Sequence, residues 1–96
     1  MSAPNTLLIV DDDPAIRRLL TALLGAAGYA LLEAADRDSA LLLAREHAPA
    51  LSLLDVRLGA ESGLELLSAL KAEHPEMSVI MISGMGSVES AVEAMQ

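Results

Sequence analysis

Short apolar runs alternate with helix-like segments along the whole chain. Four runs have the length and boundaries of strands, at 6–10, 29–34, 51–54 and 79–82. Between and after these runs, apolar residues recur three and four positions apart, as on the buried face of a helix. Strand–helix units in succession predict an α/β fold in which a parallel sheet carries helices on both faces.

Polar residues mark where the predicted helices begin. The expected N-caps are Asp13, Asp36, Ser62 and Ser87. Pro14 follows Asp13 and suits the first position of a helix. Glu65 lies three residues after Ser62, which completes a capping box. The first helix is expected to turn inward Ile16, Leu19, Leu20, Leu23, Leu24 and Ala27, and to end at Gly28.

Three aspartates follow directly on two of the apolar runs. Asp11 and Asp12 come after the run 6–10, and Asp55 comes after the run 51–54. In a parallel sheet, loops at the carboxyl ends of neighbouring strands meet at one edge, where ligands bind in folds of this class. Carboxylates held so close repel and raise one another's pKa unless a cation lies among them. The sequence therefore predicts a divalent metal site at this edge.

The composition narrows the class of protein. The chain has 96 residues, of which 53% are hydrophobic, and a formal net charge of −8. This acidic balance argues against direct binding to nucleic acid or to an anionic membrane. The absence of cysteine excludes disulfides and thiolate metal sites, and no apolar stretch approaches the roughly 18 residues of a membrane span. We expect a single soluble domain, 1–96, in the cytoplasm.

Three motifs resemble those of one known family. They are Leu8-Ile9-Val10-Asp11-Asp12, Leu53-Leu54-Asp55-Val56-Arg57-Leu58 followed by Gly63, and Ile82-Ser83-Gly84. Their order and spacing are similar to those of the receiver domain of two-component response regulators, over essentially the whole chain. The resemblance implies a flavodoxin-like, doubly wound parallel sheet with strand order 2-1-3-4 and with the run 29–34 at an edge. Residues 85–95 also resemble receivers attached to sigma-54-dependent transcriptional activators.

The resemblance implies roles for individual acidic residues. Asp55 would accept a phosphoryl group from the phosphohistidine of a sensor histidine kinase. Mg²⁺ is expected on the carboxylates of Asp12 and Asp55 and on the backbone carbonyl of Arg57, while Asp11 would reach the ion through water. This inventory suits Mg²⁺, which prefers a few carboxylates together with waters and phosphate oxygens.

The resemblance also implies how the phosphoryl group is recognised. Ser83 would donate its hydroxyl to a phosphoryl oxygen, and Gly84 would offer a backbone N–H. Phosphoryl transfer depends on positioning and on neutralising charge, because a carboxylate approaches a phosphoryl group only with a cation between them. Such a domain catalyses its own aspartyl phosphorylation and dephosphorylation and is not a turnover enzyme in the usual sense.

The sequence departs from the family pattern in two respects. Receiver domains carry a lysine and an aromatic residue on a fifth strand, but Lys71 is the only lysine and lies in the third predicted helix, and Tyr29 lies on the second strand. Gly59 stands where the family usually has proline. We expect the fifth strand and fifth helix to be missing from this chain. The run 79–82 would then be an unpaired edge, through which the chain is expected to self-associate, for example as a homodimer.

Other functions and roles fit parts of the pattern. An acid-metal phosphatase would need Asp-x-Asp on the nucleophile strand, which Asp55-Val56-Arg57 lacks. A receiver that acts only as a protein-interaction module stays open, because the fifth-strand lysine is missing. Arg17 and Arg18 are expected to face solvent or a partner, and His47 and His74 to suit helix C-termini.

Overall fold

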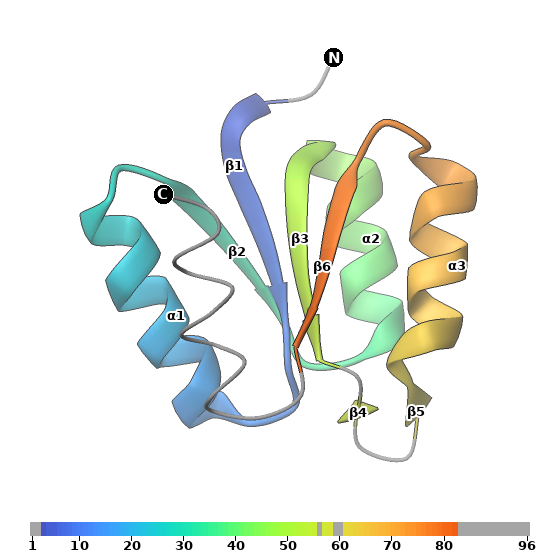
Figure 1. Cartoon of the computed structure of the whole chain (residues 1–96), viewed down its shortest axis with the longest axis horizontal. Coiled ribbons are helices and arrows are strands. Elements are labelled where there is room, and N and C mark those ends of the chain that lie inside the picture. The colour runs from blue at the N-terminus through green and yellow to red at the C-terminus, as the bar shows by residue number, and fades with distance from the viewer. Residues whose placement is uncertain (1–2, 56, 59–60, 83–96) are drawn as a thin grey trace.

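The chain folds as a parallel sheet with helices on both faces (Figure 1). The structure is a computed structural model, and it describes residues 3–55, 57–58 and 61–82. The strands are β1 (Ala3–Val10), β2 (Ala30–Ala34), β3 (Pro49–Asp55), β4 (Arg57–Leu58), β5 (Glu61–Ser62) and β6 (Ser78–Ile82). The helices are α1 (Pro14–Ala26), α2 (Arg37–His47) and α3 (Gly63–Glu73).

The strand order confirms the flavodoxin-like arrangement. The four longer strands form one parallel sheet in the order β2-β1-β3-β6, which is the predicted order 2-1-3-4. The sequence did not predict the antiparallel pair of β4 and β5, because strands of two residues are too short to show a periodic pattern. The expected helix that Ser87 would cap lies outside the described residues, as does Gly59.

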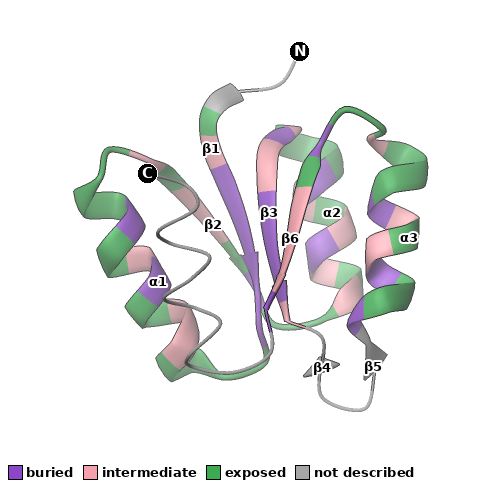
Figure 2. Cartoon of the chain, in the orientation of Figure 1, coloured by how far each residue is buried: buried purple, intermediate pink, exposed green. Residues whose placement is uncertain are grey.

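Alternate residues of β1 point to opposite faces of the sheet and supply two separate cores. Leu8 and Val10 belong to the core that includes residues of α2 and α3, whereas Leu7 and Ile9 belong to the core that includes residues of α1. Figure 2 shows the two central strands, β1 and β3, buried over most of their length. Because both faces are covered, β1 and β3 carry no charged residue before Asp55, at the end of β3.

Helix α1 turns a narrower face to the sheet than the sequence predicted. Leu20 and Leu24 are buried as expected, but Leu19 and Leu23 are 37% and 45% exposed, and Ala27 is also exposed. The two buried leucines are four residues apart and therefore lie one above the other along the line of contact. Each residue before them is rotated by about 100° around the helix. The prediction that Leu19, Leu23 and Ala27 face inward was therefore wrong.

The predicted helix boundaries are confirmed where the structure describes them. Asp13 caps α1 by accepting a hydrogen bond from the N–H of Ala15 at 2.9 Å, and Asp36 caps α2 through the N–H of Ser39 at 2.8 Å. Gly28, with φ of 100°, follows α1 in the left-handed conformation that ends a helix. Among the described residues, no helix is long and apolar enough to cross a membrane.

Strand β6 is an edge of the sheet within the part of the chain that the structure describes. It pairs with β3 from Leu51↔Ser78 to Asp55↔Ile82. Its residues Val79, Ile80 and Met81 are partly exposed. Self-association through this edge stays a prediction.

The hydroxyl of Thr21 should destabilise the fold. Its Oγ1 is buried on α1 and has no hydrogen-bond partner among the described residues. An unpaired buried hydroxyl costs about 1–3 kcal/mol, whereas the lower helix propensity of valine costs only a few tenths. We expect Thr21→Val to raise the free energy of unfolding by about 1 kcal/mol in urea denaturation. Thr21→Ser keeps the hydroxyl and should not stabilise. A less stable Thr21→Val would show that the hydroxyl is satisfied by solvent.

Candidate metal and phosphoacceptor site

The sheet register places two aspartates at the same level of neighbouring strands. Val10 of β1 pairs with Leu54 of β3, and these are the last buried apolar residues of the two strands. The next residues are Asp11 and Asp55, so both emerge at the carboxyl edge of the sheet, at the bottom of Figure 1. Ile82 of β6 pairs with Asp55 on its other side. The position matches the edge at which open α/β sheets bind ligands.

The three predicted aspartates do come together. One carboxylate oxygen from each of Asp11, Asp12 and Asp55 can lie within 4.8 Å of the other two. Asp11 is buried, with 4% of its surface exposed, while Asp55 is half-buried and Asp12 is exposed. This graded burial leaves the cluster open to solvent on the Asp12 side. Carboxylate oxygens in this number and spacing fit a hard divalent cation such as Mg²⁺, which keeps part of its water shell.

The electrostatics of Asp11 show that the cluster is strained without a cation. The pKa of Asp11 is raised from 3.8 to about 6, chiefly because the carboxyl is buried and also because of the negative charges of Asp55, Asp12 and Asp13. A hydrogen bond from the N–H of Asp13 acts in the opposite direction. A carboxyl with a raised pKa at the carboxyl edge of a sheet is typical of functional sites.

Backbone and side-chain hydrogen bonds fix the loop that follows β1. The N–H of Asp11 donates to the carbonyl of Ala34 at 3.1 Å, which continues the pairing with β2 by one residue. The Oδ1 atom of Asp11 accepts from the N–H of Asp13 at 2.9 Å, and Nη1 of Arg17 donates to the carbonyl of Asp11 at 2.7 Å. Three hydrogen bonds therefore fix the backbone of this loop before any ligand binds.

Arg17 corrects one expectation from the sequence. It was expected to face solvent or a partner, but only 18% of its side chain is exposed and it lies between the Asp11 carbonyl and the carboxylate of Glu33. Arg18, its neighbour, is exposed as predicted. The signal available in the sequence was the position of Arg17 in the first turn of α1, directly after the acidic loop. Helical geometry returns such a side chain toward the preceding turn.

The remaining predicted site residues are placed only in part. Arg57 begins β4, two residues after Asp55, which keeps its backbone close to the cluster along the chain. Ser83 and Gly84 lie outside the described residues. Lys71 donates to the carbonyl of Met77 at 2.7 Å, near the start of β6, so it lies at the opposite end of the sheet from the acidic cluster.

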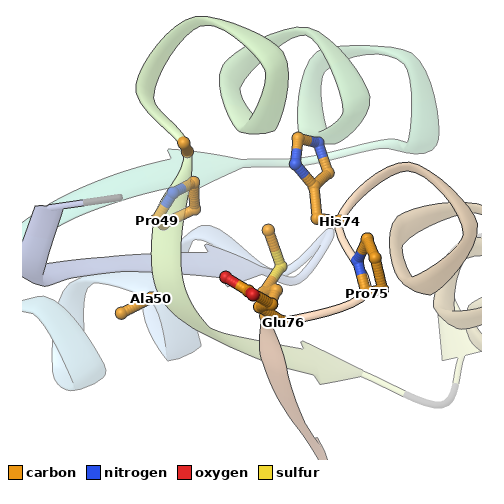
Figure 3. A pocket seen from close by; sticks show the side chains of 7 residues that line it. Pro49, Ala50, His74, Pro75 and Glu76 are labelled. Atoms are coloured by element: carbon orange, nitrogen blue, oxygen red, sulfur yellow. The ribbon is translucent and has the colours of Figure 1, made fainter. Parts of the chain in front are cut away.

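A hollow at that opposite edge is separate from the acidic cluster. It has a volume of about 400 Å³ and is lined by Ala48, Pro49, Ala50, His74, Pro75, Glu76 and Met77 (Figure 3). The Nε2 atom of His74 is buried there without a hydrogen-bond partner among the described residues. None of the predicted site residues lines this hollow.

Comparison with known proteins identifies the family. The family model described as "Response regulator receiver domain" matches residues 7–96. The nitrogen assimilation regulatory protein NtrX of Azorhizobium caulinodans is 45% identical over 94 residues, which cover 96% of this chain and 21% of that protein. The chain therefore spans about a fifth of the length of this relative.

Solved structures agree with the sequence comparison. The receiver domain of NtrX from Brucella abortus is 43% identical, with a TM-score of 0.78 and coverage of 93% of this chain and 76% of that chain. A response regulator protein from Burkholderia pseudomallei, crystallised with a phosphorylated aspartic acid, a calcium ion and citrate, is 31% identical. Its TM-score is 0.80, and the match covers 95% of this chain and 54% of that chain.

The likeness to NtrX agrees with the expected relation to sigma-54-dependent activators. The fold, the acidic cluster at the carboxyl edge and the match over residues 7–96 lead to one assignment. This chain belongs to the response regulator receiver domain family.

Proposed function

We propose that Asp55 is the phosphoacceptor of this receiver domain and that Asp11 and Asp12 serve it by holding Mg²⁺. The observation that carries the proposal is the convergence of the three carboxylates at the end of β1 and β3. Asp55 is the member of the cluster that stands alone on its strand, facing the acidic pair from the next strand. It is half-buried, so a donor can reach it from solvent.

The proposed reaction is a displacement at phosphorus. A carboxylate oxygen of Asp55 forms a new bond to the phosphorus atom, while the bond from phosphorus to the donor breaks and its electron pair leaves with the donor. In the family this donor is the phosphohistidine of a sensor histidine kinase. When bound, Mg²⁺ supplies positive charge that offsets the repulsion between the carboxylates and the phosphoryl oxygens.

Residues of this chain would divide the work of holding the ion. Asp12 and Asp55 would bind it directly with the backbone carbonyl of Arg57, and Asp11 would hold a bound water. The burial of Asp11 and its hydrogen bond to Asp13 suit this supporting role, because they restrict its carboxylate. Ser83 and Gly84 would contact the phosphoryl oxygens from the end of β6. The protein of Burkholderia pseudomallei, which carries a phosphorylated aspartic acid and a calcium ion, supports the pairing of these two features.

Partners and location follow from the same proposal. A sensor histidine kinase is the proposed macromolecular partner. The cytoplasm is the proposed location, because receivers of this family accept phosphoryl groups from kinases there. The net charge of −8 argues against direct DNA binding by this segment.

Treatment with acetyl phosphate and Mg²⁺, followed by intact mass measurement, tests the proposal. We expect one added phosphoryl group that is labile to hydroxylamine, and its complete loss in Asp55→Asn. Asp38→Asn, which removes a charge from an exposed position in the first turn of α2, should still be modified.

Two outcomes would contradict the assignment. An adduct that persists in Asp55→Asn would place the acceptor elsewhere. No adduct in the parent protein would favour a domain that acts only through protein interactions, as expected if the family lysine is indispensable.

A further inference from the structure

The guanidinium of Arg17, on α1, contacts the acidic loop 11–13. Nη1 of Arg17 donates to the backbone carbonyl of Asp11 at 2.7 Å, which is short for an N–H···O bond and is strengthened by the charge of the guanidinium. The side chain is only 18% exposed. Arg17 is therefore partly buried and hydrogen-bonded, unlike a solvated surface arginine.

Glu33 holds the guanidinium from the other side. Its Oε1 lies 3.4 Å from Nε of Arg17, and Glu33 is on β2, where it pairs with Ile9 of β1. Arg17 thus connects three elements: the first turn of α1, the loop after β1 and the edge strand β2. A planar guanidinium can make both contacts at once, which a lysine ammonium cannot reproduce with the same geometry.

The carbonyl that Arg17 holds controls the next residue. The Asp11–Asp12 peptide is planar, so fixing its oxygen fixes the orientation of the whole unit and the direction in which Asp12 leaves it. Asp12 is exposed, so its carboxylate depends on this backbone for its position. Asp12 is also the member of the cluster on the solvent side.

We propose that Arg17, fixed by Glu33, is a positioning residue that presets the Asp11–Asp12 peptide for binding of the divalent cation. It does not touch the ion. This role rests on the proposed function, because it explains part of the affinity of the three aspartates for the divalent cation. Loss of the guanidinium would let the peptide rotate, and cation binding would then have to order it again.

The test compares Mg²⁺ binding by calorimetry in the parent, Arg17→Met, Arg17→Lys and Glu33→Gln, with Arg18→Met as the matched control. Arg18→Met removes the same charge from the adjacent, exposed position. We expect about a tenfold weaker Kd in Arg17→Met, the scale of one hydrogen bond to a charged group. Arg17→Lys and Glu33→Gln should give smaller losses, and Arg18→Met should bind like the parent.

A second readout needs no metal. Amide hydrogen exchange in EDTA reports on the N–H of Asp13, which is bonded to Asp11 Oδ1. We expect faster exchange in Arg17→Met than in Arg18→Met. Glu33→Gln keeps the test valid if Arg17→Met fails to fold.

The outcomes separate the two proposals. Equal Mg²⁺ affinity and equal Asp13 exchange in the Arg17 and Arg18 variants would overturn the positioning role while leaving the metal site intact. A different pair of results would uphold the loop contact and overturn the proposed metal function. These results are faster Asp13 exchange in Arg17→Met than in Arg18→Met, and no Mg²⁺ binding by the parent protein.

Discussion

Millimolar Mg²⁺ should raise the melting temperature of the parent protein and leave that of Asp12→Asn nearly unchanged. A bound ion would relieve the repulsion among Asp11, Asp12 and Asp55, whose carboxylate oxygens can lie within 4.8 Å of one another. A ligand that binds only the folded state stabilises it by RT ln(1 + [L]/Kd), about 2.7 kcal/mol at a hundred times Kd. For a domain of this size, that corresponds to a shift of roughly 10 °C or more.

A thermal melt followed by circular dichroism, with and without Mg²⁺, measures this effect. Glu76→Gln is the matched control, because it removes one exposed negative charge at the opposite edge of the sheet (Figure 3). It should keep the full Mg²⁺ response. If Mg²⁺ does not change the melting temperature of the parent protein, the three carboxylates do not form a metal site.

Without metal, the stability of the parent should fall as the pH rises from about 4 to about 6, and Asp11→Asn should remove this dependence. The pKa of Asp11 is raised from 3.8 to about 6 in the folded protein, so the folded state binds its proton more tightly than the unfolded chain does. This contribution is complete below the unfolded pKa and is lost as the pH passes the folded pKa.

The expected size is modest and measurable. One pKa unit corresponds to about 1.4 kcal/mol, and screening near the solvent edge reduces the effect, so Asp11→Asn should be more stable than the parent by about 1–2 kcal/mol at pH 7. The asparagine oxygen can still accept the hydrogen bond from Asp13. Urea denaturation in EDTA between pH 4.5 and 7.5 measures the difference.

Other shifted carboxyls affect the parent and Asp11→Asn alike. Hydrogen bonds from Ser39 lower the pKa of Asp36 below 3.8, and the Arg45 side chain lowers that of Glu73 below 4.5. Their contributions to stability are the same in the parent and in Asp11→Asn, so the difference between the two pH profiles reports on Asp11. The pH profiles of parent and Asp11→Asn should converge at the acid end, and parallel profiles would show that Asp11 is not the titrating group.

The sequence predicted the parts of the fold that depend on long patterns. The buried strands, the caps at Asp13 and Asp36 and the meeting of Asp11 with Asp55 follow from runs of apolar residues and the residues that end them. The strand order followed from the resemblance to receiver domains. The rotation of α1 could not be predicted, because leucines at 19, 20, 23 and 24 allow two neighbouring faces. Packing against β1 and β2 selects one of them.

The role of Arg17 was missed for a different reason. Its contacts are with a backbone carbonyl and with Glu33 on β2, sixteen residues further along the chain. In the sequence, Arg17 is one of two adjacent arginines, which give no periodic signal that one of them is buried. The contact with Glu33 becomes visible only after the strand order has brought β2 beside the loop that follows β1.

The covered faces of β3 restrict how this domain can change in evolution. Leu53 and Leu54 are both fully buried, and they enter different cores. Insertion or deletion of one residue before Asp55 would exchange the two sets of side chains and move the carboxylate away from Asp11. Lineages of this protein can therefore vary these positions by substitution of apolar residues of similar volume, while changes in length are confined to loops beyond the strand ends.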